Sequence, residues 1–533
     1  MYTRGVALIL FFASVAAYSI AEPAANPGDQ SIVTTDRGPV RGIVTTTLRM
    51  YLGIPYAAPP IGRLRWRPPT VHARWSTPLN ATKFANHCPQ EASVFGTASV
   101  TEDCLYLNVF RPKADDAAIT SRTCPVMVWI HGGAFTVGES DDYIPTTLVQ
   151  RGVIVVTINY RLGALGFLAH PALSAESLEH ISGNYGIMDQ QFALKWVKRN
   201  IASFGGDPDQ VTVFGESAGG LSVLLQLASP LGAGLFHGAL AESGSYGLTV
   251  PTLADEEQHG QNFAASVGCV EQSAQCLRSR STKKILANWG LFDSSPNVDG
   301  KVLSQSPDTA FATGQFNHVP LIHGTTHDEW RFFVALFFDL SGAPITPDEY
   351  SSVVESMVGP DAAPAVLGEY PLAYYESPDL AVGAIGADSI FSCPARAGDQ
   401  VLAAQIPTFT YEFNDTSAPE LFLPPVSFPY GATHASELLY LFTLSRGGQL
   451  DEAQQKLSKD MIRYWTQFAK SGDPNSPGAS FWPRYDIRTD EFQSLVPPSP
   501  VTEFGFATDH KCDFWASLLG ASARRAARTA KRP

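Results

Sequence analysis

The chain has 533 residues, 44% of them hydrophobic, so it can bury a large core, and its net charge of −14 argues against a nucleic-acid partner. Seven cysteines are more typical of an exported protein than of a cytosolic one. No repeat, low-complexity run or linker-like tract divides the chain, which favours one large domain over several.

The N-terminus has the pattern of a secretory signal. Arg4 precedes a short apolar run, residues 6–17, and small residues near Ala21 suit cleavage. That run is too short to span a bilayer comfortably, and no other segment predicts a transmembrane helix. We therefore predict a signal peptide over residues 1–21, a domain over 22–520 and a basic, disordered tail over 521–533. The protein is expected to be secreted or periplasmic.

Apolar runs that alternate with helical stretches predict an α/β fold with a large, mostly parallel central sheet. The predicted strands are residues 125–130, 153–158, 211–214, 238–240, 319–322 and 408–413. Helical periodicity is present over 189–201, and residues 31–35 and 40–46 predict a hairpin that turns at Arg37-Gly38. The less regular region from about 293 to 375 predicts a cap or the wall of a gorge.

Ser217 lies in Gly215-Glu216-Ser217-Ala218-Gly219, between a predicted strand and a predicted helix. This is the pattern of a nucleophile elbow, in which a tight turn exposes the serine and small residues two positions away leave room for it. The motif arises often by chance, so other residues must support it. Glu216 is interpreted as a buried hydrogen-bonding residue.

A glycine-rich segment upstream supports the elbow. His131, Gly132 and Gly133 follow the strand predicted over 125–130. Backbone N–H groups of consecutive glycines are accessible to a substrate oxygen, and we predict that those of Gly132, Gly133 and Ala218 form an oxyanion hole. The alternative is a glycine turn that only ends a strand.

Several motifs together resemble the type-B carboxylesterase family, which includes cholinesterases and lipases and has the α/β-hydrolase fold. Besides the elbow, the resemblance rests on Tyr51-Leu52-Gly53-Ile54-Pro55-Tyr56-Ala57, Glu102-Asp103-Cys104-Leu105-Tyr106-Leu107-Asn108-Val109 and Gly183-Asn184-Tyr185-Gly186-Ile187-Met188-Asp189-Gln190. It covers residues 31–519 and implies ester hydrolysis through a Ser-Glu-His triad and an acyl-enzyme intermediate. No metal or organic cofactor is implied.

The resemblance also implies the partners of Ser217. The acid is Glu329, in Gly324-Thr325-Thr326-His327-Asp328-Glu329, with Asp328 as its rival, and the base is His434. The order serine, acid, histidine agrees with this fold. His327 is interpreted as structural.

Two cysteine pairs are close enough in sequence to close short loops, although spacing leaves the connectivity open. They are Cys88 with Cys104 and Cys269 with Cys276. The resemblance supports both pairs and implies a third, Cys393 with Cys512, which leaves Cys124 free.

The expected substrate is a small, neutral acyl ester. Between Cys88 and Cys104 the only aromatic residue is Phe95, whereas cholinesterases place a tryptophan there for a quaternary ammonium. One alternative is a lipase for longer-chain acylglycerols, in which the Phe-rich stretch 330–340 contributes to a lid. A non-catalytic adhesion-type relative is the second alternative, disfavoured because all three triad candidates are present. The oligomeric state is left open.

Overall fold

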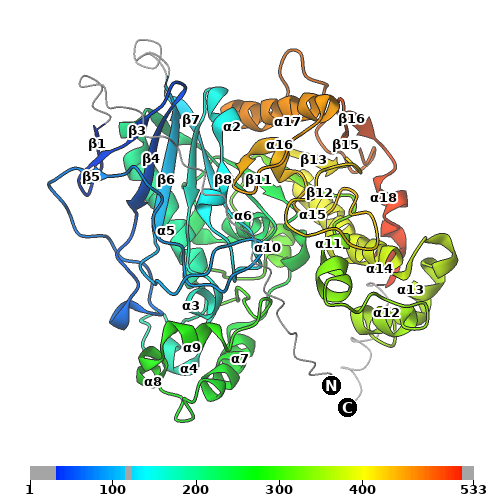
Figure 1. Cartoon of the computed structure of the whole chain (residues 1–533), viewed down its shortest axis with the longest axis horizontal. Helices are drawn as coiled ribbons and strands as arrows, with labels where there is room; N and C mark the ends of the chain where they lie inside the picture. The colour runs from blue at the N-terminus through cyan, green and yellow to red at the C-terminus, as the bar shows by residue number, and fades with distance from the viewer. Residues whose placement is uncertain (1–31, 114–122, 519–533) are drawn as a thin grey trace.

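The computed structural model describes residues 32–113 and 123–518. At its centre is an 11-stranded sheet in the order β16-β15-β13-β12-β11-β10-β7-β9-β6-β4-β3 (Figure 1). The strands from β9 to β15 in this order run parallel, while the strands at both edges pair antiparallel. The predicted signal peptide and basic tail lie outside the described residues.

The strands of the large sheet have the following bounds: β3 Ile43–Val44, β4 Leu48–Pro55, β6 Tyr106–Pro112, β7 Cys124–Ile130, β9 Ile154–Ile158, β10 Gly206–Glu216, β11 Gly238–Glu242, β12 Leu321–Thr326, β13 Thr408–Phe413, β15 Phe492–Leu495 and β16 Val501–Glu503. Two small sheets contain β1 Ile32–Thr34, β2 Pro39–Arg41 and β5 Leu79–Asn80, and β8 Tyr143–Ile144 with β14 Thr443–Leu444. Each predicted central strand is present.

The helices have the following bounds: α2 Thr146–Gln150, α3 Gly163–Phe167, α4 Pro171–Ser174, α5 Tyr185–Asn200, α6 Ala218–Ala228, α7 Leu253–Ser266, α8 Ala274–Ser279, α9 Thr282–Leu286, α10 Pro307–Thr313, α11 Arg331–Val334, α12 Tyr350–Val358, α13 Ala363–Glu369, α14 Pro378–Gly386, α15 Cys393–Ala403, α16 Leu438–Leu441, α17 Glu452–Ser471 and α18 Phe506–Asp509. Figure 1 shows two outer groups, α7 to α9 and α11 to α14, on the lower side of the molecule.

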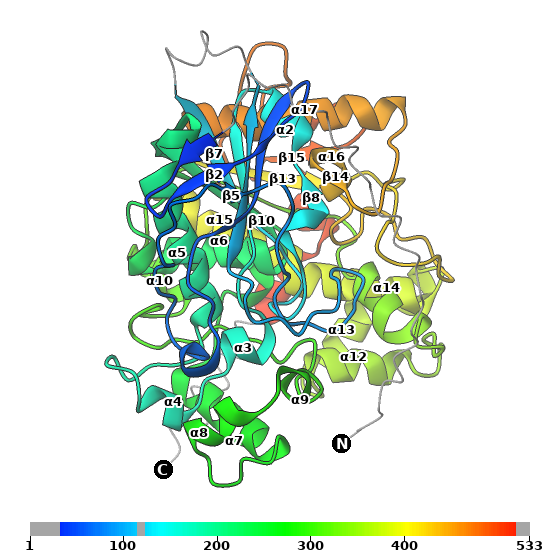
Figure 2. The same cartoon turned by 60° about the vertical axis from the view of Figure 1, so that its left-hand side comes forward.

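Helices cover both faces of the sheet, and strand side chains alternate between them. On β7, Val126 and Val128 pack into the cluster that includes α5 and α6, whereas Met127 and Trp129 pack into the cluster that includes α17. Both faces are therefore apolar, which explains the continuous apolar runs in the sequence. Figure 2 shows α5 and α6 beside the sheet and α17, in orange, at the top of the view.

The helix predicted over 189–201 begins earlier, at Tyr185. Tyr185, Gly186 and Ile187 in its first turn are buried, and a Cβ on Gly186 would lie 2.7 Å from the carbonyl oxygen of Arg161. Consecutive buried residues show no amphipathic period, so the pattern reveals only the later turns.

The predicted hairpin is partly wrong. Strands β1 and β2 pair antiparallel, with the turn closed by a hydrogen bond from the Thr35 hydroxyl to the carbonyl oxygen of Gly38. The second strand ends at Arg41, however, and β3 joins the large sheet instead. The break is at Gly42, where a Cβ would lie 2.4 Å from the Met50 carbonyl oxygen, so the chain passes too close to β4 to continue the hairpin.

Among the described helices, none has the length and apolar character needed to cross a membrane.

Candidate active site

Ser217 lies in a strained turn between β10 and α6. Its φ of 56° is in the left-handed region, which non-glycine residues rarely adopt. A Cβ on Gly215 would lie 2.5 Å, and one on Gly219 1.9 Å, from the carbonyl oxygen of Ile130, so both positions require glycine. The elbow therefore has the local geometry that the sequence predicts.

Glu329 and His434 are brought together from segments far apart in the chain. Glu329 follows β12, and one of its carboxylate oxygens lies 2.6 Å from Nδ1 of His434. Its other oxygen accepts a hydrogen bond of 3.0 Å from the amide of Thr326. Both side chains are buried, so the imidazole is held in one orientation.

Asp328, the rival acid, faces a different set of partners. Its carboxylate contacts Arg331 at 2.8 Å and His327 at 3.1 Å, and it accepts a hydrogen bond of 2.9 Å from the amide of Ala432. These partners hold the pKa of Asp328 below its usual value despite burial. Asp328 thus joins the loop of Glu329 to the loop that carries His434.

The glycine-rich segment after β7 presents free backbone donors. Gly133 has a φ of 99°, and a Cβ on Gly132 would lie 3.0 Å from that of Ser217. Among the described residues, the amides of Gly132 and Gly133 donate to no acceptor. His131 lies behind them, and burial lowers its pKa to about 4, so it is uncharged at neutral pH. Ala218 is the first residue of α6, where the helix leaves its amides without internal partners.

The second ring nitrogen of His434 faces the serine turn. His434 Nε2 lies 3.2 Å from a carboxylate oxygen of Glu216, the residue before Ser217. The Tyr246 side chain lies near that of Ser217, and both residues line the same cavity. Sequence reasoning interpreted Glu216 as a buried hydrogen-bonding residue but did not predict its contact with His434. It missed Tyr246, because nothing in the local pattern around that residue signals its proximity to the site.

A group of buried carboxyl groups lies behind the serine. Burial, with the nearby charges of Glu437, Glu329 and Glu242, raises the pKa of Glu216 well above its usual value. Burial similarly raises the pKa of Glu437, and raises that of Glu242 to about 8. Burial thus favours the protonated form of these groups, including the Glu216 carboxyl that faces His434.

Ser217 and His434 open into a cavity of about 410 Å³. Its walls are mostly apolar, and among the described residues no lysine or arginine lines it. The rings of Phe333 and Phe391 pack on the imidazole of His434, with centroids 5.1 and 5.3 Å away. The region from about 293 to 375 was predicted to form a cap or gorge wall. Part of it does line the cavity, while its residues 321–326 form the core strand β12.

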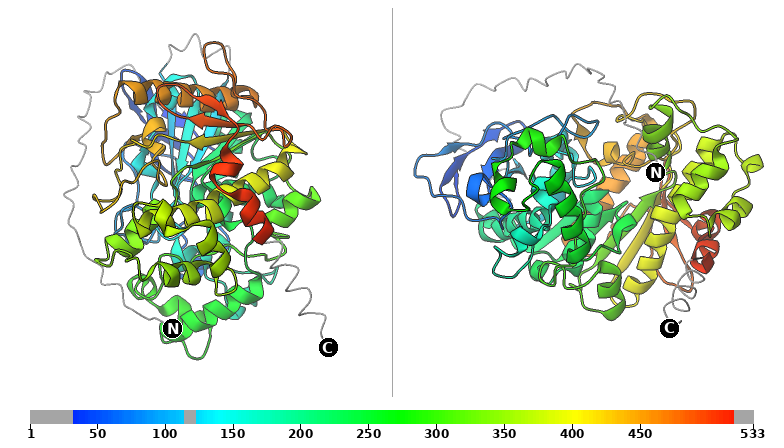
Figure 3. Two further views of the ribbon diagram at one scale, coloured as in Figure 1. Left: turned by 90° about the vertical axis from the view of Figure 1, so that its right-hand side faces the viewer. Right: turned by 90° about the horizontal axis from the view of Figure 1, so that it is seen from below.

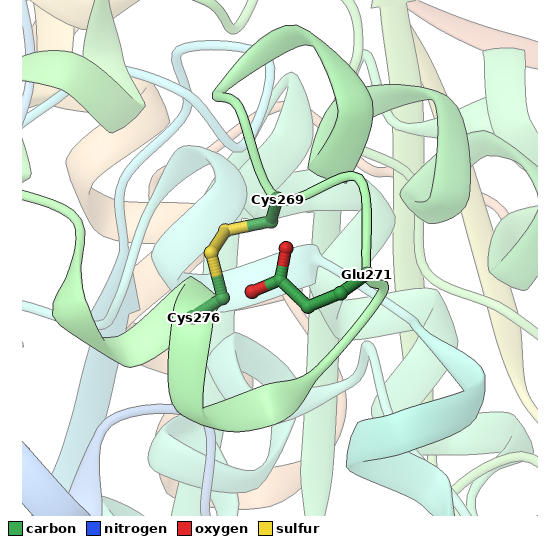
Figure 4. A group of neighbouring side chains, drawn as sticks. All are labelled: Cys269, Glu271 and Cys276. Carbon is green, nitrogen blue, oxygen red and sulfur yellow. A yellow bond between two sulfur atoms is a disulfide. The ribbon is translucent and has the colours of Figure 1, made fainter.

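Three disulfides are present, and they are the pairs that the resemblance implies: Cys88–Cys104, Cys269–Cys276 and Cys393–Cys512. Cys124 is free and half-buried. The first disulfide closes the loop from which Phe95 reaches the cavity wall. Figure 4 shows the second beside Glu271; because both sulfur atoms are bonded to each other, this group offers no thiolate to a metal ion.

Comparisons with known proteins agree with this geometry. Residues 29–515 match the profile of the Carboxylesterase family. The chain is 34% identical over 516 residues to an acylcarnitine hydrolase of Mus musculus, covering 90% of this chain and 89% of that protein. It is also 34% identical over 500 residues to a para-nitrobenzyl esterase of Bacillus subtilis (strain 168), covering 88% and 95%.

Among solved structures, a PNB esterase superposes with a TM-score of 0.77 at 33% identity, covering 91% of this chain and all of that one. A thermophilic PNB esterase gives a TM-score of 0.78 at 32% identity. The expected α/β-hydrolase fold is therefore confirmed. On this evidence the chain belongs to the carboxylesterase family and is a carboxylic ester hydrolase.

Proposed function

We propose that Ser217, His434 and Glu329 are the nucleophile, general base and orienting acid of this esterase, with the amides of Gly132, Gly133 and Ala218 as the oxyanion hole. The observation that carries the proposal is the 2.6 Å contact of His434 with Glu329, in the cavity that Ser217 lines. The strained φ of Ser217 and the free glycine amides support it.

The proposed reaction has two steps. Nε2 of His434 takes the proton of Ser217 as the hydroxyl attacks the ester carbonyl, and the developing oxyanion is stabilised by the backbone amides. The protonated imidazole then gives its proton to the leaving alcohol, and Glu329 stabilises it meanwhile. Water activated by His434 hydrolyses the acyl-enzyme and releases the carboxylate.

The proposed substrates are neutral esters with apolar acyl groups of moderate size. A cavity of about 410 Å³ lies at the lower end of the range for small-molecule sites. Its aromatic walls favour apolar groups. Because no described lysine or arginine lines it, a substrate carboxylate or phosphate would enter without a partner charge.

A second candidate, hydrolysis of longer-chain acylglycerols, is favoured by the rim of the cavity. Phe292 and Phe337 line it, lie in edge-to-face contact with centroids 5.5 Å apart, and remain 53% and 41% exposed. Exposed aromatic side chains at a cavity mouth suit contact with an aggregated lipid.

We also propose that the protein is secreted or periplasmic, acting after removal of residues 1–21. Three disulfides are compatible with an oxidising compartment. N-terminal sequencing of protein recovered from the medium or periplasm tests this proposal: a mature chain starting near residue 22 supports it, and an intact N-terminus contradicts it.

The catalytic proposal is tested by hydrolysis of p-nitrophenyl acetate, butyrate and palmitate. We expect Ser217→Ala to abolish turnover of all three, while Ser222→Ala, one turn further along α6, retains it. Faster hydrolysis of acetate and butyrate supports the esterase, whereas a rate that rises when palmitate exceeds its solubility supports the lipase. Full activity of a correctly folded Ser217→Ala variant would contradict the triad.

A further inference from the structure

A second group of titratable side chains lies outside the cavity, where three segments meet. Glu412 is on β13, which pairs with β12 so that Thr325 and Glu412 are partners. His327 follows the end of β12, and His510 follows α18. The left view of Figure 3 shows α18, in red, beside the edge strands of the sheet and the yellow-green helices.

The three side chains form a compact set of donors. A ring nitrogen of His327, a ring nitrogen of His510 and a carboxylate oxygen of Glu412 all lie within 4.8 Å of one another. Two imidazoles and one carboxylate are a common ligand set for transition-metal ions, zinc in particular.

Each histidine is oriented by a carboxylate on its Nδ1 atom. Nδ1 of His510 lies 2.6 Å from Asp388, and Nδ1 of His327 lies 3.1 Å from Asp328. Metal-bound histidines characteristically engage a carboxylate through their other nitrogen, which fixes the ring and leaves Nε2 for the metal.

These outer carboxylates are themselves held in place. Asp388 accepts a hydrogen bond of 2.7 Å from the Tyr370 hydroxyl, which in turn accepts one of 2.7 Å from the indole of Trp515. Asp328 is fixed by Arg331 and the amide of Ala432. Such supported outer partners are a property of built metal sites.

The local charges also favour a cation. Glu503, on β16, lies near Glu412, and its Oε1 atom is buried without a hydrogen-bond partner. Among the described residues, no lysine or arginine forms an ion pair with either carboxylate; the ion-pair partner of Glu412 is His510. A divalent ion between the two carboxylates would replace the His510 proton as the positive charge that faces Glu412.

We propose that His327, Glu412 and His510 form a zinc-binding site, with Glu503 or water as the fourth ligand. His327 is 37% exposed, which provides a path of entry from solvent. Binding requires Nε2 of His510 to be free of its proton and to move apart from Glu412, which it contacts at 2.5 Å. The ion would connect the C-terminal segment to the loop that carries Glu329, and the inference does not depend on the assignment of the triad.

Another cluster in the chain serves as a comparison. His87 lies 3.1 Å from Glu139 and 3.0 Å from Asp141, which is a single imidazole placed between two carboxylates. It has no second histidine, so this cluster offers one imidazole where the proposed site offers two. We interpret it as an ion-paired group that fixes the loop beside Cys88, and it provides a matched control.

The test uses the full mature chain with Cys124→Ser, produced without a polyhistidine tag and stripped with a chelator. Zinc binding is measured by titration calorimetry, and cobalt(II) absorbance reports the geometry of the ligands. We expect one tight site per chain that persists in His87→Ala. His327→Ala and Glu412→Gln should remove it, and Asp388→Asn should weaken it by about 10- to 100-fold.

Two results would overturn the proposal: the absence of stoichiometric zinc binding, or binding that survives unchanged in either His327→Ala or Glu412→Gln. Because His327 is partly exposed, its variant is expected to fold, and circular dichroism checks this. Thermal melting gives a second readout: zinc should raise the Tm of the starting protein and of His87→Ala, but not that of His327→Ala.

Discussion

Within residues 32–113 and 123–518, two sets of serine, histidine and acid lie close together, and one of these two sets lines the cavity described above. In the second set, Nε2 of His323 lies 2.9 Å from the Ser245 hydroxyl, and Nδ1 of His323 lies 2.7 Å from Asp399. The residue types and the order of contacts are those of a catalytic triad. By hydrogen bonding alone, this set is more complete than the one at Ser217.

The surroundings of the two serines differ. Ser245, His323 and Asp399 are each at most 2% exposed, and none of them lines the cavity, although Tyr246 and Gly247 do. Ser217, by contrast, has a strained φ and faces free glycine amides. A serine, histidine and acid in hydrogen-bond contact are thus a candidate catalytic site only where a substrate can enter and where free N–H groups can bind its carbonyl oxygen. The set at Ser245 is better explained as satisfaction of buried polar groups.

The largest expected effect is the difference in kcat between substitutions of His434 and of His323. We expect His434→Ala to lower kcat by about 10⁴- to 10⁶-fold, because the base is lost. His323→Ala removes a buried hydrogen-bonded side chain and should lower the Tm while leaving kcat per folded molecule within an order of magnitude. Kinetics with active-site titration measure both. Equal losses of kcat in the two variants would contradict the distinction between the sets.

The two neighbouring acids sharpen the comparison. Glu329→Gln should lower kcat by about 10⁴-fold, because an amide does not stabilise the imidazolium and favours the wrong tautomer. Asp328→Asn leaves Glu329 in contact with His434, so it should lower the Tm but reduce kcat less than Glu329→Gln does. The pH dependence of kcat/KM is the measurement. The assignment fails if Asp328→Asn is the more damaging change in rate.

A substitution in the glycine-rich segment tests the role of free amides. A Cβ on Gly133 would lie 2.2 Å from the carbonyl oxygen of Val137, so Gly133→Ala must displace the peptide. We expect kcat to fall by about 10²- to 10³-fold. Gly152→Ala is the control, because Gly152 also has a positive φ, 85°, but nothing lies within 4 Å of its Cβ position. If both variants keep the same kcat, the amides are not the oxyanion donors.

The smallest effect concerns Glu242, which ends the strand before Ser245. Its pKa rises from 4.5 to about 8 on folding, so the folded protein holds a proton that the unfolded chain releases. This contribution to the free energy of unfolding is fully present below about pH 4.5, decreases as the pH rises, and levels off above about pH 8. Glu242→Gln should therefore flatten the fall in Tm between pH 5 and 8.

Glu452→Gln, on the exposed face of α17, is the control for that measurement. It should leave the pH dependence of Tm unchanged. A Glu242→Gln curve that parallels the starting protein across this range would show that Glu242 does not hold its proton.

The fold could be predicted well from sequence because its central strands are buried on both faces. Continuous apolar runs such as 125–130 therefore stand out, and Gly215 and Gly219 mark the elbow by their chemistry. The first turn of α5 and the end of β2 could not be predicted in the same way. The reasons are contacts with Arg161 and Met50.

In the candidate site, too, local motifs could be predicted from the sequence, whereas tertiary contacts could not. Motifs place Ser217, Glu329 and His434, but the choice between Glu329 and Asp328 depends on packing against Arg331 and Ala432. Tyr246, Glu242 and Glu437 lie outside the serine motif, and nothing in their local sequence shows that they approach the site. Contacts of this kind arise only when the strands are assembled.

The rim of the cavity has a consequence for how this enzyme can diversify. Phe292 and Phe337 belong to segments that carry none of the proposed reacting groups, whereas Ser217, Glu329 and His434 are held by the ends of strands and by a separate loop. Replacing the rim residues should change which esters enter without disturbing bond cleavage. Substrate selectivity can therefore change gradually, in evolution or in a mutant library, at rim positions where a poor substitution leaves the catalytic residues intact.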